Sequence, residues 1–187
     1  MSPLSKKPSF VVVDYETTGL EAHIHVPLEL GLVVVNDNLD VLAEISSVIQ
    51  PAVMPTWHEL HESVQRMHTM NGLIEAIQGG EGSVKSQVEE DFIVFLDENN
   101  ATGLPMCGSS VQFDRSWMQV HMPDLASEFH YRNIDISTIK ELCRRYNPRV
   151  FEAAPTKLEQ HRSLPDCHET LTELDHYLEE FFMVDLV

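Results

Sequence analysis

Two acidic residues end the first apolar run of the chain, where Phe10–Val13 is followed by Asp14, Tyr15 and Glu16. Four apolar, mostly β-branched residues predict a buried strand. Residues two apart in a strand point to the same face, so the two carboxylates are expected to lie close together. Like charges held that closely repel unless a cation lies between them, and hard oxygen ligands suit Mg²⁺ or Mn²⁺. The alternative is a solvated acidic turn at the end of a strand.

Two further acidic residues and one histidine lie at the edges of predicted helices and strands. Asp114 follows the small residues Gly108–Ser110, between a short strand and a helix, and sites in α/β sheets tend to form at the carboxyl ends of strands. Asp166 opens the last predicted helix, and His161 lies five residues before it. Each has a simpler explanation alone. Asp166 could favour the helix dipole, and His161 could be a surface histidine.

The five residues form an ordered set of acids with one base: Asp14, Glu16, Asp114, His161 and Asp166. Four carboxylates can hold two divalent cations about 3.5–4 Å apart, which stabilises both the attacking and the leaving oxygen in phosphodiester cleavage. A histidine can accept a proton from the attacking water near neutral pH. The set therefore predicts a metal-dependent phosphodiesterase.

The elements that must position these residues follow from the hydrophobic pattern and the turn signals. Strands are predicted over Phe10–Asp14, Glu29–Val35, Val41–Ile49, Leu104–Cys107 and Asn133–Ile136. Helices are predicted over His58–Gln78, Ser83–Glu98, Asp114–His121, Ser137–Tyr146 and Pro165–Phe182. The short links between the first three strands predict an antiparallel meander. We expect one α/β domain over residues 1–187, a sandwich around a mixed five-stranded sheet, with residues 1–8 as a flexible tail.

The formal net charge of −18 disfavours a long nucleic acid bound over the whole surface, because phosphate binding is largely electrostatic. The segment from Arg132 to Arg162 is locally positive and could bind a short anionic substrate. The three cysteines are scattered and lack Cys-x-x-Cys spacing, which favours a reducing cytoplasm over a disulfide framework. No apolar run reaches the length of a membrane span, so no membrane partner is expected.

At these motifs the chain resembles the DEDD 3′→5′ exonucleases of the histidine branch, which have a ribonuclease H-like fold. The Asp14–Leu20 stretch is similar to the Asp-Leu-Glu-Met-Thr-Gly-Leu of oligoribonucleases, and Cys107–Ser110 to their Cys-Gly-Asn-Ser. The block His130–Leu142 matches one peculiar to oligoribonucleases nearly residue for residue. The resemblance spans about Phe10 to Phe182 and implies a 3′→5′ exoribonuclease that hydrolyses very short RNA to nucleoside 5′-monophosphates.

The resemblance also assigns roles to individual residues. It implies that Asp14, Glu16, Asp114 and Asp166 bind two Mg²⁺ or Mn²⁺ ions and that His161 is the general base. It implies substrate-binding roles for Leu20 as a wedge between bases, for His68, for the hydroxyls of Ser110, Ser137 and Thr138 as a cap on the 5′ phosphate, and for Tyr131 and Arg132 reaching from the partner of a homodimer. No nucleotide cofactor is implied. Simpler alternatives are a core leucine for Leu20, a helix N-cap for Ser137 and surface packing for Tyr131.

One departure concerns base stacking. Relatives carry a tryptophan where this chain has Ser63, and Trp57 lies further upstream.

Three other functions remain open from the sequence. A broader exonuclease of the same family would trim longer RNA or single-stranded DNA, and a non-catalytic relative would bind without cleaving. A zinc site built on His58 and His61, or on His161 and His168, is a third idea, although the spacing matches no zinc motif.

Overall fold

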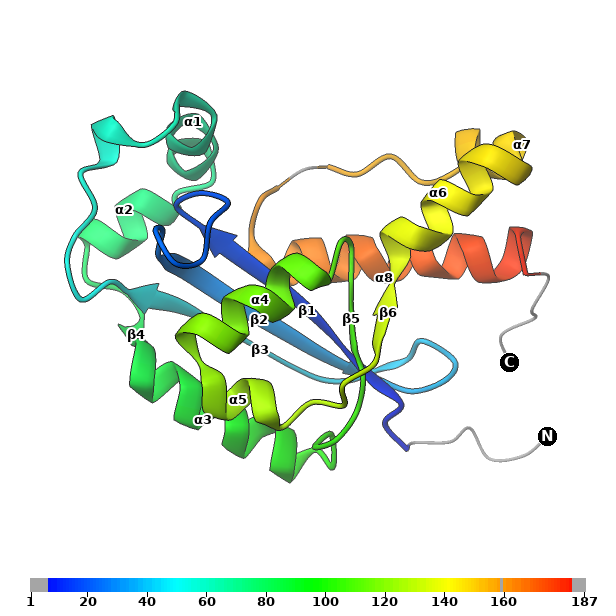
Figure 1. Ribbon diagram of the computed structural model, residues 1–187, viewed down its shortest axis with the longest axis horizontal. Coiled ribbons are helices and arrows are strands. Elements are labelled where there is room, and N and C mark those ends of the chain that lie inside the picture. The colour runs from blue at the N-terminus through cyan, green and yellow to red at the C-terminus, as the bar shows by residue number, and fades with distance from the viewer. Residues whose placement is uncertain (1–6, 159, 183–187) are drawn as a thin grey trace.

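The computed structural model describes residues 7–158 and 160–182, and its centre is one mixed sheet in the order β4-β3-β2-β1-β5-β6 (Figure 1). The strands are β1 Phe10–Thr17, β2 Pro27–Val35, β3 Val41–Gln50, β4 Ser83–Val84, β5 Met106–Gly108 and β6 Asn133–Asp135. The predicted antiparallel meander of β1, β2 and β3 is confirmed, and β5 joins β1 in parallel. Most of the tail predicted over residues 1–8 lies outside the described residues.

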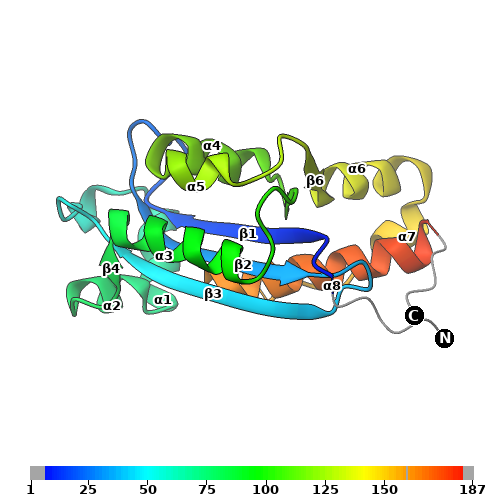
Figure 2. The same cartoon turned by 90° about the horizontal axis from the view of Figure 1, so that it is seen from below.

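Helices cover both faces of this sheet. They are α1 Glu62–Met70, α2 Leu73–Gln78, α3 Lys85–Glu98, α4 Gln112–His121, α5 Pro123–Ser127, α6 Ile136–Tyr146, α7 Pro148–Glu152 and α8 Ser163–Glu180. Apolar residues of α3, α4 and α5 share one core with the sheet, and those of α6, α7 and α8 share another. Figure 2 shows α4 and α5 on one side of β1 and α8 on the other. Among residues 7–158 and 160–182, no helix has both the length and the apolar character needed to cross a bilayer.

The alternation of side chains along β1 determines which way the two acids point. Val11 and Val13 pack in the core under α3 and α4, whereas Phe10 and Val12 pack against α6 and α8. Because side chains alternate along a strand, Asp14 shares the face of Phe10 and Val12, and so does Glu16. Both acids therefore leave β1 on the side of the sheet that α8 covers.

The beginning of α8 lies directly on the sheet because β2 carries a glycine there. Gly31 pairs with Asp14 across the β1–β2 ladder. A Cβ at Gly31 would lie 2.9 Å from the Cβ of Ser163, the first residue of α8, which is closer than two carbon atoms can approach. The glycine therefore allows the first turn of α8, with Asp166, to reach β1.

The single helix predicted over His58–Gln78 is wrong. A 3₁₀ turn at Trp57–Glu59 precedes α1, and α1 is separated from α2 by Asn71 and Gly72. The φ angle of Gly72 is +77°, a left-handed conformation that suits glycine and ends α1. The apolar pattern continues through this break, so periodicity alone did not reveal it.

The sheet has six strands where the sequence predicted five. Ser83 and Val84 were expected to begin a helix, but they pair in parallel with Ile49 and Gln50 at the end of β3 as the short edge strand β4. The short helices α5 and α7 were also not predicted. Each begins at a proline, Pro123 and Pro148, which favours the first turn of a helix.

Candidate active site

Residues from two distant parts of the chain meet where β1 ends. One possible ligand atom each from Glu16, His161 and Asp166 lies within 4.8 Å of the other two. Within residues 7–158 and 160–182, this is the one group of three or more acidic, histidine or cysteine side chains that could share a cation by that geometry. Neither histidine pair considered for zinc, His58 with His61 or His161 with His168, belongs to such a group in that part of the chain.

Asp114 reaches the same end of β1 from the first turn of α4. Its Oδ1 accepts a hydrogen bond of 3.1 Å from the backbone N–H of Tyr15, which lies between Asp14 and Glu16. The carboxylate is 4% exposed, so it is turned inward to the sheet instead of outward to solvent. Asp14 and Asp114 are not members of the 4.8 Å group. The charges of Asp114, Glu16 and Asp166 all raise the pKa of Asp14, so β1, α4 and the start of α8 bring the four carboxylates within electrostatic range of one another.

The pKa values show how strongly these acids influence one another. Burial raises the pKa of Asp14 well above its usual range, and the charges of Asp114 and Glu16 raise it further. Burial, followed by the charges of neighbouring acids, raises the pKa of Glu16 to about 8. The pKa of Asp114 rises to about 7 and that of Asp166 to about 6, in both cases mainly because of burial. Such a cluster is unfavourable in its fully ionised form unless positive charge is added.

The donor set fits a hard divalent cation. All four acids offer carboxylate oxygens, which suit Mg²⁺ or Mn²⁺. The Oδ1 atom of Asp166 is buried without a hydrogen-bond partner, although a buried carboxylate oxygen normally has one. An unpartnered buried oxygen on a residue that lies among acids with raised pKa values is consistent with a metal ligand.

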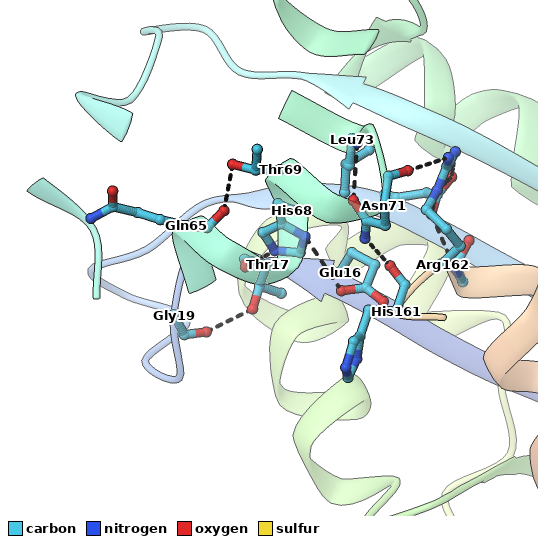
Figure 3. A network of polar contacts seen from close by, with 12 residues as sticks. Glu16, Thr17, Gly19, Gln65, His68, Thr69, Asn71, Leu73, His161 and Arg162 are labelled. Carbon is cyan, nitrogen blue, oxygen red and sulfur yellow. Dashed lines mark hydrogen bonds and ion pairs between the residues drawn. The ribbon is translucent and has the colours of Figure 1, made fainter. Parts of the chain in front are cut away.

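A network of polar contacts holds the backbone of His161 (Figure 3). His161 has a φ of +53°, a conformation uncommon for a non-glycine residue. Its carbonyl accepts a hydrogen bond from the side-chain amide of Asn71, the residue that ends α1. The next residue, Arg162, pairs with the buried Glu29 of β2 through contacts of 2.6 to 3.1 Å. The segment before α8 is therefore fixed to both α1 and the sheet.

His68 supports the end of β1 from behind. One ring nitrogen, Nε2, lies 2.9 Å from the carbonyl oxygen of Thr17, and the other, Nδ1, lies 3.9 Å from Oε2 of Glu16. The side chain is fully buried, and this burial lowers its pKa. The ring lies beside Glu16 and Thr17 (Figure 3) and is fully buried, so the expected contact of His68 with substrate is not available in this conformation.

The three hydroxyls expected to cap a phosphate lie together around the carboxylate of Asp135. The Oγ atoms of Ser110 and Ser137 are 3.0 Å apart. Asp135 Oδ1 accepts from the backbone N–H of both serines, and Oδ2 accepts from the hydroxyl of Thr138. Asp135, rather than Ser137, is the N-cap of α6, so the alternative role considered for Ser137 is wrong. The hydroxyl of the half-buried Ser137 lies beside that of the exposed Ser110.

The remaining substrate-binding candidates lie on the surface. Leu20 is 83% exposed in the loop after β1, so it is not a core leucine. Tyr131 is 74% exposed, and the guanidinium carbon of Arg132 lies 5.4 Å from the centre of its ring. Both positions are available to a ligand or to another chain.

The two positions that bear on base stacking have different surroundings. Trp57 packs against the apolar cluster of Leu28, Leu73 and Ile77, and its indole N–H is buried. Ser63 instead lines a cavity of about 1300 Å³ beside His161. The cavity lies between α1 and the segment before α8. Trp57 is therefore a partly buried residue at the edge of that cluster, and the position of Ser63 leaves open space next to the candidate active site.

Several residues that shape this site were not identified from the sequence. No motif in the sequence indicated the roles of Asn71, Glu29 and Arg162. The one available signal was Glu29 itself, because an acid in the otherwise apolar strand β2 indicates a buried ion pair. The basic segment from Arg132 to Arg162 also offers less free positive charge to an anionic substrate than its composition indicated. Arg162 is paired with Glu29, and two of its other arginines, Arg144 and Arg145, are paired with Glu141.

Comparison with known proteins identifies the family to which this chain is similar. The family model of the RNase T exonucleases matches residues 11–174. An oligoribonuclease of Corynebacterium efficiens is 37% identical over 178 residues, which cover 94% of this chain and 80% of that protein. An oligoribonuclease of Idiomarina loihiensis is 36% identical, with 97% and 99% covered, and a mitochondrial oligoribonuclease of Mus musculus is 34% identical, with 92% and 73% covered.

Solved structures support the fold independently. A structure of exonuclease I matches with a TM-score of 0.68 at 14% identity, covering 90% of this chain. A complex of Escherichia coli exonuclease I with an oligonucleotide matches with a TM-score of 0.70, also at 14% identity. This chain spans about two fifths of the length of those proteins, 40% and 41% respectively, so the likeness concerns their exonuclease-like fold alone. From the family match and the relatives of similar length, this chain belongs to the RNase T family of DEDD exonucleases and, within it, to the oligoribonucleases.

Proposed function

We propose that this 3′→5′ exonuclease hydrolyses very short RNA, from dinucleotides to a few nucleotides, to nucleoside 5′-monophosphates. The observation that carries the proposal is the convergence of Glu16, His161 and Asp166 within 4.8 Å, at a strand end that Asp114 also reaches. The identity to oligoribonucleases over nearly the whole chain supports the substrate class. We further propose that residues 1–187 form one catalytic domain, because both helical layers of the described part pack on the same sheet.

In the proposed mechanism His161 is the general base. Its imidazole accepts a proton from the water that attacks the terminal phosphodiester, and the network around Asn71 holds its backbone in place. Asp14, Glu16, Asp114 and Asp166 would hold two divalent cations, Mg²⁺ or Mn²⁺. When bound, these cations would supply Lewis acidity at the phosphate and offset the charge of the four acids. His68 keeps Glu16 in position instead of contacting the substrate.

Leu20 and the three hydroxyls around Asp135 fit the proposed binding of a short substrate. Leu20, in the loop after β1, is available to insert between two bases. Ser110, Ser137 and Thr138 are proposed to bind the 5′ phosphate. A cap at that end would exclude longer strands, and the net charge of −18 would also disfavour them.

Timed hydrolysis of 5′-labelled RNA of two to ten nucleotides tests this function. With Mn²⁺ present, we expect dinucleotides to be consumed at least about tenfold faster than ten-mers, because a longer strand meets the cap; without metal, we expect no turnover. Faster cleavage of ten-mers would instead support the broader exonuclease. Lack of cleavage at every length with metal present would support the non-catalytic alternative.

We also propose that the active form is a homodimer in which Tyr131 and Arg132 of one subunit reach the site of the other. Both side chains are exposed, and the guanidinium group of Arg132 lies over the ring of Tyr131, so both are available to a second subunit. Mixing an inactive His161→Ala protein with an inactive Tyr131→Ala/Arg132→Ala protein should then restore part of the activity. In such a mixed dimer, one site receives an intact histidine and an intact tyrosine–arginine pair. A mixture as inactive as its components would contradict this arrangement.

The three cysteines provide an indication of the cellular compartment. Cys107, Cys143 and Cys167 are buried and unpaired, which is consistent with the proposed cytoplasmic setting.

A further inference from the structure

Lys157 lies near two parts of the candidate active site, the carboxylate of Asp166 and the hydroxyl cluster formed by Ser110, Ser137 and Thr138. It belongs to the segment between α7 and α8, and its side chain is 30% exposed. Its Nζ is 3.2 Å from the Oγ of Ser109, which directly precedes Ser110 of the hydroxyl cluster. Its charge also opposes the rise in pKa that burial causes at Asp166. The ammonium group therefore contacts Ser109, next to the hydroxyl cluster, and is within electrostatic range of Asp166.

A buried carboxylate fixes Lys157 in this place. Oε2 of Glu173, in α8, lies 3.1 Å from Nζ of Lys157, and Oε1 lies 3.0 Å from Nζ of Lys140, in α6. The side chain of Glu173 is 3% exposed, and its Oε1 also accepts from the hydroxyl of Tyr177. Two lysines share one carboxylate, so the group carries one excess positive charge. The ammonium group of Lys157, which carries part of this positive charge, faces Ser109.

The hydroxyl cluster needs such a charge if it is to bind a phosphate. Ser110, Ser137 and Thr138 are uncharged, and they gather around the carboxylate of Asp135, which repels an anion. Hydroxyl groups alone would therefore distinguish poorly between a terminal phosphate and a terminal hydroxyl. A cation beside them offsets the charge of Asp135 and forms a stronger, charge-assisted hydrogen bond with phosphate.

We propose that Lys157 is a specificity-determining residue that binds the 5′-terminal phosphate of the oligonucleotide. When phosphate binds, the ammonium group keeps its contact with Glu173 and exchanges Ser109 for a phosphate oxygen. Lys157 thereby makes the enzyme prefer 5′-phosphorylated over 5′-hydroxyl ends. This inference rests on the proposed function, because it takes Ser110, Ser137 and Thr138 to be the phosphate cap.

The test compares two dinucleotides that differ only in a 5′ phosphate, with hydrolysis followed by chromatography in the presence of Mn²⁺. For Lys157→Met we expect kcat/KM on the phosphorylated dinucleotide to fall about 10- to 100-fold, as expected for loss of a charge-assisted hydrogen bond. On the 5′-hydroxyl dinucleotide it should fall less than about threefold. Lys157→Arg, which keeps the charge, should retain most of the preference.

Lys140→Met is the matched control. Lys140 pairs with the same buried carboxylate at nearly the same distance, but the hydrogen bond to Ser109 is made by Lys157. Lys140→Met should therefore keep the preference for phosphorylated ends, and thermal midpoints of all variants report any loss of folding.

Three results would overturn the role of Lys157: an equal loss on both substrates in Lys157→Met, the same loss of preference in Lys140→Met, or a wild-type protein without any preference. A wild-type protein that prefers neither end but still cleaves dinucleotides overturns this inference alone. A protein that cleaves neither substrate contradicts the proposed function itself.

Discussion

Replacement of His161 by alanine is expected to lower kcat on a dinucleotide by about 10²- to 10⁴-fold at saturating Mn²⁺, the usual contribution of a general base. The imidazole lies within 4.8 Å of ligand atoms of Glu16 and Asp166, so its removal leaves the attacking water without a proton acceptor at the reacting phosphate. KM should change much less than kcat, because the hydroxyl cluster is untouched. Initial rates measured across a substrate series, with the thermal midpoint as a check on folding, separate these effects.

His168→Ala is the control for this prediction. His168 also lies near the start of α8, but its side chain is exposed and pairs with Glu44 of β3 at 2.8 Å. Its removal should leave the rate within about twofold of the parent, as is usual for a surface substitution away from the site. If His161→Ala hydrolysed the dinucleotide at the parent rate, the assignment of the general base would be wrong.

The metal-free protein is expected to lose stability as the pH rises from about 5 to about 8. Burial and neighbouring acids raise the pKa of Glu16 from 4.5 to about 8. Between these values the folded state binds more protons than the unfolded state, so the free energy of unfolding falls with increasing pH and levels off above the folded-state pKa. For this buried side chain the loss is on the order of 3 kcal/mol, or roughly 10 °C in the thermal midpoint.

Thermal unfolding in EDTA and in Mn²⁺, measured at pH 5.5 and pH 8, tests this expectation. Mn²⁺ should raise the midpoint more at pH 8, because ionised carboxylates bind the cation and protonated ones do not. Glu16→Gln should flatten the pH dependence in EDTA and stabilise the metal-free protein while removing activity. Glu98→Gln, which neutralises an exposed residue of α3, controls for the overall negative charge. A metal-free midpoint that is constant or rises over this range would contradict the acid cluster as described.

The sequence by itself determined the family and most of the secondary structure, and it predicted the chemistry of the site. The spacing of Asp14 and Glu16 on an apolar strand places them on one face wherever the strand lies, because alternation is a local property of extended backbone. The antiparallel β1–β3 meander was likewise encoded by short links and turn residues. The order of the five acid and base residues, with the block His130–Leu142, was sufficient to predict the family.

The tertiary structure decided which residues hold that chemistry in place. The apolar pattern across Asn71 looked helical, yet a left-handed Gly72 ends α1 there and lets Asn71 bind the carbonyl of His161. His68 had the motif of a substrate ligand but lies buried behind Glu16.

Lys157 shows the same dependence on the fold. No sequence motif indicated a role for this residue, and only the tertiary structure places it between Glu173 and Ser109. Contacts of this kind join residues 16 to 90 positions apart in the chain. A linear pattern records periodicity and spacing, but it does not record which distant side chains become neighbours when the sheet and α8 close on each other.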